Sequence, residues 1–316
     1  MPPAETSFVR ADGRRLQVVP GFRERVLASR PAMTPRPHWT PADYERAADK
    51  KLKRGLRLMS DVVRWQPLQP RRDRDTVLDV GCGDGINCLV LALLAGSRSV
   101  GLDLQPRLFD TTETGALARQ LAARVLERLD ASRTLDDALH ELPVSFAKGD
   151  ATTLPFPDNS IDVLISRSAL EHIVPLECAL SEMARAVRPG GVIHHAVDPY
   201  YWLRGCHKRG LVDIPWAHAR LSLEDFRRFV TEREGETVAA KRCTRLQTLN
   251  RLTLAQWRGA VEAGPFEILE WIEEPVPFAV AVLDEYPDVV DSLADGVEPR
   301  DLVHGRLEFW LRVTKS

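Results

Sequence analysis

Two aspartates in the first half of the chain stand where a bound nucleoside could use them. Asp79 ends a β-branched and aliphatic run and leads into glycines at alternating positions, in the order Asp79-Val80-Gly81-Cys82-Gly83-Asp84-Gly85. Glycine permits positive φ and lets the backbone approach a ligand closely. Asp103 follows roughly 20 residues later, where an acid can accept hydrogen bonds from both ribose hydroxyls. A glycine-rich turn alone is also typical of ordinary strand-to-helix connections, but the loop and Asp103 together predict a nucleoside site.

A second group of residues could carry proton transfer. Histidine titrates near neutral pH, and a hydroxyl acceptor needs a base to remove its proton. His172 follows one predicted strand and Asp198 ends the next, so we take His172, His195 and Asp198 as candidate catalytic residues. His194 and His195 alternate in a strand and point to opposite faces, so only one of them can face a substrate. Each of these residues could instead serve packing or hydrogen bonding, and His207 and His218 are further candidates.

These residues require a scaffold of alternating strands and helices. The predicted strands are 76–80, 99–103, 144–148, 161–165 and 192–197, and the helices that follow the first and fourth strands are 86–95 and 176–188. Between 106 and 141 we expect one long helix and a shorter helix capped near Ser132. Such alternation implies a mostly parallel sheet with helices on both faces, which binds ligands outside the carboxyl ends of its strands. Asp79, Asp103 and Asp198 all lie at such ends.

The segments before and after this core have different characters. Residues 1–38 are proline-rich and are expected to be irregular or to wrap over another surface. Thr40 followed by Pro41 predicts a helix that starts there and runs to about Trp65, near the ligand site. We therefore divide the chain into an N-terminal arm and cap helix, 1–70, and a main domain, 71–316.

The aromatic-rich stretch 198–250 is interpreted as a substrate-side insertion that roofs an acceptor pocket. The alternatives are an extension of the core or a dimer surface. Within it we predict a helix over 223–233. Beyond it we predict a helix over 254–263 and strands over 266–272 and 306–313, and these two strands could supply the antiparallel end of the sheet. The apolar run 276–283 is expected to pack on the N-terminal helix or on a second subunit.

Composition argues for a protein of the cytoplasm. The 316 residues carry a formal net charge of −2, and the arginines are scattered among acids, so no nucleic-acid partner is expected. No apolar run is long enough for a signal sequence or a membrane span. The five cysteines form no metal-binding or disulfide pattern, and no metal is predicted.

In order and spacing, the segments between 76 and 197 resemble class I S-adenosylmethionine-dependent methyltransferases of the small-molecule, type 11 kind. The resemblance is carried by Val77–Gly85, Gly101-Leu102-Asp103, Gly149-Asp150-Ala151, Phe156–Leu164, Leu170-Glu171-His172 and Arg188-Pro189-Gly190-Gly191. Nicotinamide-binding enzymes use G-x-G-x-x-G, whereas this loop reads G-x-G-x-G after an acid. The resemblance implies a doubly wound α/β fold with a mostly parallel, seven-stranded Rossmann-like sheet and S-adenosyl-L-methionine as cofactor.

The same resemblance implies which residues contact the cofactor. Asp79 and the loop backbone would face its methionine end, Asp103 the ribose, and Asp150 the adenine amino group. Arg167 is an unusual neighbour of this cofactor and could instead meet an anionic substrate. The full set of implied contacts is Asp79, Gly81, Cys82, Gly83, Asp103, Leu104, Asp150, Ala151, Ser166 and Arg167. For Asp79 and Asp150, helix or turn capping is the alternative role.

The expected activity is methyl transfer to a small hydroxylated metabolite, such as a sugar or natural product of secondary metabolism. Transfer from a sulfonium is an in-line displacement, which depends on holding the reactants collinear in a dry site. N- or C-methylation of a small metabolite is one alternative, and a non-catalytic scaffold that binds S-adenosylmethionine is another. A homodimer is compatible with the apolar surface runs.

Overall fold

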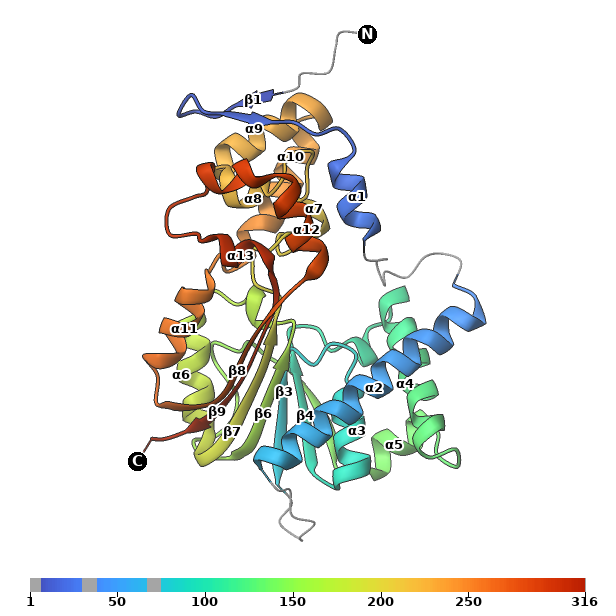
Figure 1. The fold of residues 1–316 in the computed structure, drawn as a ribbon. Helices are drawn as coiled ribbons and strands as arrows, with labels where there is room; N and C mark the ends of the chain where they lie inside the picture. Colours follow the sequence, from blue (N-terminus) through green and yellow to red (C-terminus); the bar gives the residue numbers. More distant parts are fainter. Residues whose placement is uncertain (1–6, 30–38, 67–74, 316) are drawn as a thin grey trace.

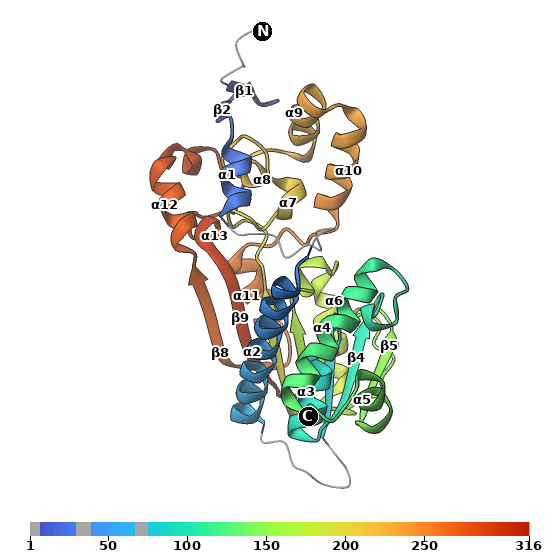
Figure 2. The ribbon, with the colours of Figure 1, turned by 90° about the vertical axis from the view of Figure 1, so that its right-hand side faces the viewer.

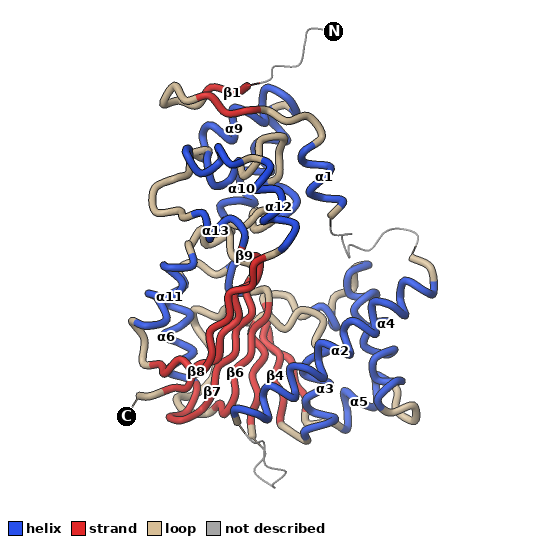
Figure 3. The backbone as a smooth tube through the Cα atoms, in the orientation of Figure 1, coloured by secondary structure: helices blue, strands red, loops and turns tan. Residues whose placement is uncertain are grey.

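The computed structural model describes residues 7–29, 39–66 and 75–315, and it is built around a seven-stranded sheet (Figures 1 and 3). The strand order is β5-β4-β3-β6-β7-β9-β8. Strands β3 to β7 run parallel, whereas β9 is antiparallel to both of its neighbours. The strands are β3 (Thr76–Val80), β4 (Arg98–Asp103), β5 (Val144–Lys148), β6 (Ile161–Arg167), β7 (Val187–Val197), β8 (Phe266–Pro275) and β9 (His304–Val313). The predicted doubly wound α/β fold with an antiparallel closing strand is confirmed.

Helices cover both faces of the sheet because its central strands are apolar on both faces. On one face, Leu58 and Val62 of α2 (Pro41–Trp65) pack in one cluster with Val77 of β3. On the other face, α6 (Leu176–Ala186) and α11 (Leu254–Glu262) pack against Leu78 and its neighbours. This three-layer arrangement leaves the carboxyl ends of the parallel strands open at one edge (Figure 1).

The helices of the first half lie largely where their cap residues predict them. Helix α2 starts with a capping box in which the Thr40 side chain accepts from Asp43 N, with Pro41 at the first helical position. The region after β4 holds a short 3-10 turn and two helices, and the second helix is capped by Thr134, two residues from the predicted cap near Ser132. These elements are α3 (Ile86–Ala95), η1 (Arg107–Phe109), α4 (Glu113–Leu129) and α5 (Leu135–Glu141).

Strands β6 and β7 are longer than their sequence patterns predict, and β4, β8 and β9 are each extended at one end as well. Strand β7 begins at Val187, so Arg188-Pro189-Gly190-Gly191 lies inside the strand instead of separating it from α6. The pairing register with β6 shifts between Ile161 and Val163, and Gly190 takes a φ of 75°, so this stretch is an irregular strand end. Strand β6 continues to Arg167, two residues beyond the predicted end. This extension changes which side chains reach the strand's carboxyl edge.

A separate group of short elements, here called the cap, lies above the carboxyl edge of the sheet (Figures 1 and 2). It combines three stretches that are distant in sequence, 7–28, 200–249 and 276–303. Its elements are β1 (Ser7–Val9), β2 (Arg15–Gln17), α1 (Phe22–Ala28), α7 (His207–Gly210), α8 (Ala217–Arg220), α9 (Leu223–Glu234), α10 (Glu236–Gln247), α12 (Pro277–Glu285), η3 (Pro287–Ser292) and α13 (Pro299–Val303). The N-terminal arm therefore wraps over another surface, as predicted, and it includes a hairpin and a helix that the sequence did not reveal.

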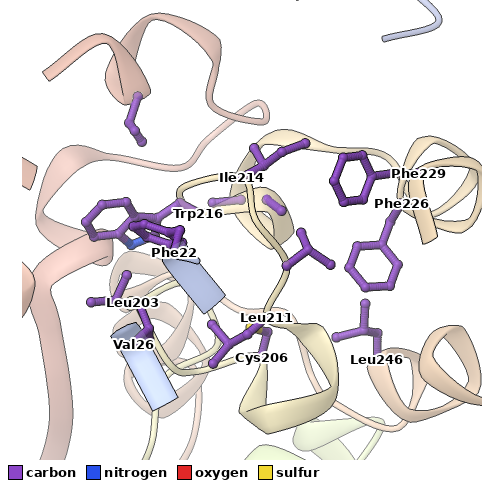
Figure 4. Close-up of a cluster of buried hydrophobic side chains, with 14 of the residues drawn as sticks. Phe22, Val26, Leu203, Cys206, Leu211, Ile214, Trp216, Phe226, Phe229 and Leu246 are labelled. Carbon is purple, nitrogen blue, oxygen red and sulfur yellow. The ribbon is translucent and has the colours of Figure 1, made fainter. Parts of the chain in front are cut away.

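The cap has its own hydrophobic core, separate from the clusters that flank the sheet (Figure 4). Phe22 and Val26 of α1 and the large side chain of Trp216 are each no more than 2% exposed. Arg25 of α1 forms an ion pair with Glu285 of α12 at 2.7 Å. The apolar run 276–283 packs in this core with α1, whereas the N-terminal helix predicted from the sequence was 41–65, which is α2. The two parts of the predicted 1–70 unit lie against different partners, since α1 joins the cap and α2 joins the sheet.

None of the helices in the described ranges combines the length and the apolar character needed to cross a membrane.

Candidate functional site

The glycine loop between β3 and α3 is fixed to the end of the neighbouring strand β4. Gly81 N donates to Leu102 O at 2.7 Å, and Gly83 N donates to Asp103 Oδ2 at 2.9 Å. Gly81 and Gly83 have φ angles of 73° and 54°, which favour glycine. A Cβ on Gly81 would lie 2.3 Å from the Cβ of Ala169, so this position has room for glycine alone. The loop backbone is therefore held as one wall of a hollow at the sheet edge.

That hollow, here called the glycine-loop pocket, has a volume of about 320 Å³. Asp103 is held there by both oxygens, because Oδ1 also accepts from Gln105 N at 2.9 Å. Asp150 accepts from the amide and the hydroxyl of Thr152, each at 2.8 Å, and so caps its turn while facing the pocket. Leu104 is 64% exposed at the rim of the pocket. The pocket is lined by Val80, Gly81, Gly83, Leu102, Asp103, Leu104, Arg107, Gly149, Asp150, Ala151, Ser168, Ala169, His172, Ile173 and Arg245.

A smaller hollow of about 200 Å³, the Asp79 pocket, lies on the other side of the same loop. Asp79 is 1% exposed, its Oδ1 has no hydrogen-bond partner in the described chain, and its Oδ2 accepts from Asn87 at a long 3.4 Å. Burial raises the pKa of Asp79 to about 7, and the nearby carboxylates of Asp84 and Asp103 add to this effect while the Asn87 hydrogen bond opposes it. Lys51 of α2 forms an ion pair with Asp84 in the same pocket. The Asp79 carboxyl is thus poised to ionise when a cation approaches.

A third hollow of about 310 Å³, the arginine pocket, lies between the sheet edge and the cap. Four arginines line it, together with the single acid Asp198 and an apolar wall that includes Trp202 and Phe278. The lining residues are Ser29, Arg54, Arg167, Ser168, Ala196, Val197, Asp198, Trp202, Arg204, Val276, Phe278, Gly305 and Arg306.

The three pockets adjoin one another at the end of β6. Ser168 lines all three of them, and Arg54 and Arg167 line both the Asp79 pocket and the arginine pocket. Ser168 has a φ of 51°, and its amide donates to Ala196 O at 2.8 Å, which fixes this corner against β7. A molecule bound along the glycine loop would therefore reach a second molecule in the arginine pocket across this corner.

The structure brings most of the predicted cofactor residues together. Of the ten residues, Ser166 is the exception, because its side chain is 2% exposed and its Oγ is buried without a hydrogen-bond partner in the described chain. Ser168 occupies the corner instead, since β6 runs to Arg167 and the chain turns out of the sheet two residues later than predicted. The other nine predicted residues line the glycine-loop pocket, the Asp79 pocket or both.

The three candidate catalytic residues have different locations. Asp198 lines the arginine pocket and His172 lines the glycine-loop pocket. His195 is fully buried against Phe309, with ring centroids 5.1 Å apart, and burial holds its pKa well below the usual value. His194 is also buried, and its Nε2 lies 2.8 Å from Glu308 Oε1. Neither ring of this pair lines one of the three pockets, because Trp310 and Phe309 of the neighbouring strand β9 lie against His194 and His195.

A group of buried titratable side chains lies behind the corner of the three pockets. The rings of His172 and His207 stack with centroids 5.1 Å apart. Burial lowers the pKa of His172 to about 4, with His207 and Arg245 contributing, so this imidazole is neutral at pH 7. Glu171 is 2% exposed, and burial together with Asp198 raises its pKa to about 8. Of these two carboxyls, only that of Asp198 lines a pocket.

Several lining residues were not identified from the sequence. Lys51 and Arg54 lie on α2 and read there as ordinary solvated charges, and Arg306 lies in the last strand. The cap contributes Trp202 and Arg204. The helical period of α2 could have indicated that Lys51 and Arg54 share a side, but no local signal places Arg306 beside them.

His, Cys, Asp and Glu side chains of the described ranges form no cluster of three or more arranged to hold a metal ion.

A doubly wound sheet with a glycine loop and a β4 carboxylate beside one pocket is the arrangement expected of a class I S-adenosylmethionine-dependent methyltransferase domain. Residues 78–194 match the family model described as a methyltransferase domain, so this part of the chain is similar to that family. S-adenosylmethionine is the cofactor of this class.

Individual relatives match over the same part of the chain. The sterol 24-C-methyltransferase of Pneumocystis carinii is 34% identical over 121 residues, which is 38% of this chain and 27% of that protein. Ajmaline N-methyltransferase of Rauvolfia serpentina is 29% identical over 127 residues, 40% of this chain and 37% of that protein. The chain thus spans less than half the length of these curated relatives. Among solved structures, phosphoethanolamine N-methyltransferase 2 of Haemonchus contortus in complex with S-adenosyl-L-methionine is 21% identical, with a TM-score of 0.47, over 83% of this chain and 53% of that one.

The residues at the site fit this cofactor. The Asp103 carboxylate is anchored by two backbone amides and keeps lone pairs for two ribose hydroxyls. The buried Asp79 Oδ1 lacks a partner in the described chain, and an ammonium group would supply one. Exposed Leu104 offers an apolar surface to a purine ring.

Proposed function

We propose that this protein transfers the methyl group of S-adenosylmethionine to a small-molecule acceptor held in the arginine pocket, and that the acceptor atom is a hydroxyl oxygen. The observation that carries this proposal is the shared corner, because Ser168, Arg54 and Arg167 each line pockets on both sides of it. When bound, the cofactor supplies an electrophilic methyl group on a sulfonium. The chain's own task is to hold the acceptor in line and to exclude water.

Asp198 is the best-placed group to receive the acceptor's proton. It lines the arginine pocket directly, whereas His172 lines the glycine-loop pocket and has a pKa of about 4, which makes it a weak base. His195 is 0% exposed and has no route to an acceptor. We therefore keep Asp198 as the candidate base and interpret His172 as a neutral wall residue that shapes the site beside the cofactor.

The charge of the pocket favours a hydroxyl acceptor over an amine. An amine is a cation at neutral pH until it loses a proton, and a pocket with four arginines and one acid disfavours a cation. A hydroxyl carries no such charge. N- and C-methyl transfer and a non-catalytic scaffold are therefore outcomes that the experiment must be able to detect.

The test begins with calorimetric titration of the purified protein with S-adenosylmethionine and S-adenosylhomocysteine. The protein is then incubated with methyl-¹³C cofactor and a panel of phenols, sugars, hydroxy acids and amines. The ¹³C chemical shift of the product methyl distinguishes oxygen, nitrogen and carbon as the attachment atom. We expect binding of both cofactor forms and an O-methyl product.

Two variants test whether Asp198 is the general base. Asp198→Asn should lower kcat by about 100-fold or more without changing S-adenosylhomocysteine affinity, since general bases typically contribute 10²–10⁴-fold. Asp284→Asn removes an exposed carboxyl of α12 and serves as the matched control. Normal turnover in Asp198→Asn would contradict its role, an N- or C-methyl product would contradict the hydroxyl assignment, and cofactor binding without any product would support the scaffold.

A further inference from the structure

The arginine pocket collects its positive charge from four separate parts of the fold. Arg54 comes from α2, Arg167 from the end of β6, Arg204 from the cap and Arg306 from β9. Scattered surface arginines, which the composition predicts, would not converge in this way on one concave site. Because the contributing elements are far apart in the chain, the convergence is a property of the tertiary structure.

Arg167 is the arginine for which the site offers the least compensation. The described residues contain no hydrogen-bond or ion-pair partner for its guanidinium, although it faces two pockets. Burial lowers its pKa to about 10, Arg54, Arg306 and Arg57 act in the same direction, and Asp198 alone opposes them. A half-buried cation surrounded by other cations is stabilised by an anion that enters its pocket.

Arg306, unlike Arg167, is held by ion pairs with acidic side chains. Arg306 forms an ion pair with Glu274 at 3.1 Å and another with Glu308, so its position is fixed from behind by the sheet. Such anchoring orders the guanidinium before a ligand arrives and lowers the entropy cost of binding. Arg306 and Arg204 line the arginine pocket but not the Asp79 pocket, whereas Arg54 and Arg167 line both.

Because the arginines line different pockets, they could bind two different anions, the carboxylate of the cofactor and an anionic group of the acceptor. Arg54 and Arg167 could contact the carboxylate of the cofactor's methionine end through the Asp79 pocket. Arg306 reaches only the acceptor side, so an anion that contacts Arg306 belongs to the acceptor. Trp202, Val276 and Phe278 line the same pocket as the arginines. The pocket thus combines cationic and apolar groups.

We propose that the methyl acceptor is an organic anion with an apolar body, whose carboxylate or phosphate group binds Arg167 and Arg306 while its body lies on Trp202 and Phe278. This proposal rests on the proposed function, because it takes the molecule in the arginine pocket to be the methyl acceptor. In this placement the methyl-accepting hydroxyl is a separate group of the same molecule and faces Asp198. Planar guanidinium groups match the geometry of both anions with paired hydrogen bonds.

The experiment measures binding to the protein loaded with S-adenosylhomocysteine, so that the cofactor's own carboxylate site is filled. Three probes share a phenyl body: benzoate, phenyl phosphate and benzyl alcohol. We expect at least one of the two anions to bind about tenfold or more tightly than the alcohol, since a charge-assisted hydrogen bond contributes roughly this factor. The stronger of the two anions distinguishes a carboxylate acceptor from a phosphate ester.

Variants tie this preference to the pocket. Arg167→Gln and Arg306→Gln should each reduce the preference for the anion by about fivefold or more, while Lys53→Gln, which removes an exposed charge of α2 next to Arg54, should leave it unchanged. Arg306→Lys keeps the charge beside Glu274 and is used if Arg306→Gln does not fold.

The outcomes separate this proposal from the function on which it rests. Equal affinities for all three probes, no binding of either anion, or an anion preference that survives both arginine substitutions would overturn the anionic acceptor. Loss of cofactor binding or absence of any methylated product would instead count against methyl transfer. An O-methyl product formed only from neutral members of the panel would uphold methyl transfer and overturn the anionic acceptor.

Discussion

Replacing Asp79 by asparagine should change how the stability of this protein depends on pH. The carboxyl is 1% exposed, and its pKa is raised from 3.8 to about 7, mainly by burial. Asparagine keeps nearly the same shape but cannot ionise. In the wild type, a raised folded pKa means that the folded state holds the proton more tightly than the unfolded state does. The stability from this group is therefore fully present below pH 3.8 and is lost as the pH rises through about 7.

The size of the effect follows from the two pKa values. Each pKa step of one corresponds to about 1.4 kcal/mol, so moving from pH 5 to pH 8 should cost the wild type about 2–3 kcal/mol of unfolding free energy relative to Asp79→Asn. The assay is urea unfolding followed by tryptophan fluorescence, with both proteins measured at both pH values in the absence of cofactor. Taking the difference between the proteins cancels the titration of groups that they share.

The matched control is Asp284→Asn, which removes an exposed carboxyl and should show the same stability difference from wild type at pH 5 and pH 8. A pH-independent difference between the wild type and Asp79→Asn would refute the reasoning, because it would mean that Asp79 ionises normally in the folded protein. The same variant should also bind S-adenosylhomocysteine more weakly at pH 8, where the wild-type carboxylate can pair with the ligand's ammonium group.

Two further predictions concern the glycine-loop pocket. Asp103→Asn should weaken S-adenosylhomocysteine binding by about 10- to 100-fold in calorimetry, because an uncharged amide loses the charge-assisted hydrogen bonds that a carboxylate makes to ribose hydroxyls; unchanged affinity would exclude Asp103 from the ribose site. Gly81→Ala should lower the unfolding free energy by about 2 kcal/mol and abolish cofactor binding, because the residue has a φ of 73° and its Cβ would lie 2.3 Å from that of Ala169. Ala169→Gly in the same chain should restore part of the stability by removing the clash, and a fully stable Gly81→Ala single variant would contradict this account.

The sequence by itself determined the sheet and most of the wall that faces the cofactor. Strand β3, helix α3 and strand β5 have the predicted bounds, and Asp79 and Asp103 lie at strand ends as expected. These features are local, because a strand, a glycine turn and a helix leave their pattern within a few neighbouring residues. Parallel pairing then brings the carboxyl ends of the strands together without further information.

The length of the strands and the burial of their side chains depend on pairing between strands, which the local sequence pattern does not show. Strand β6 gains two residues by pairing with β7, and this extension puts Ser168 at the corner of the pockets and buries Ser166. His195 looked accessible in the sequence, but β9 supplies Phe309 beside it. Whether the side chain of a strand residue can reach a ligand depends on the neighbouring strands of the sheet, which come from distant parts of the chain.

Only the tertiary structure decided the arginine pocket. The cap takes its core from residues 7–28, 200–249 and 276–303, so this core forms only where the three stretches meet. Arg54 and Arg306 stand in one pocket although they are separated by most of the chain. The glycine-loop pocket is made by one loop and its neighbouring strands, so its residues can be identified in order along the sequence. The arginine pocket lies where α2, β9 and the cap meet, so it exists only once these elements have packed.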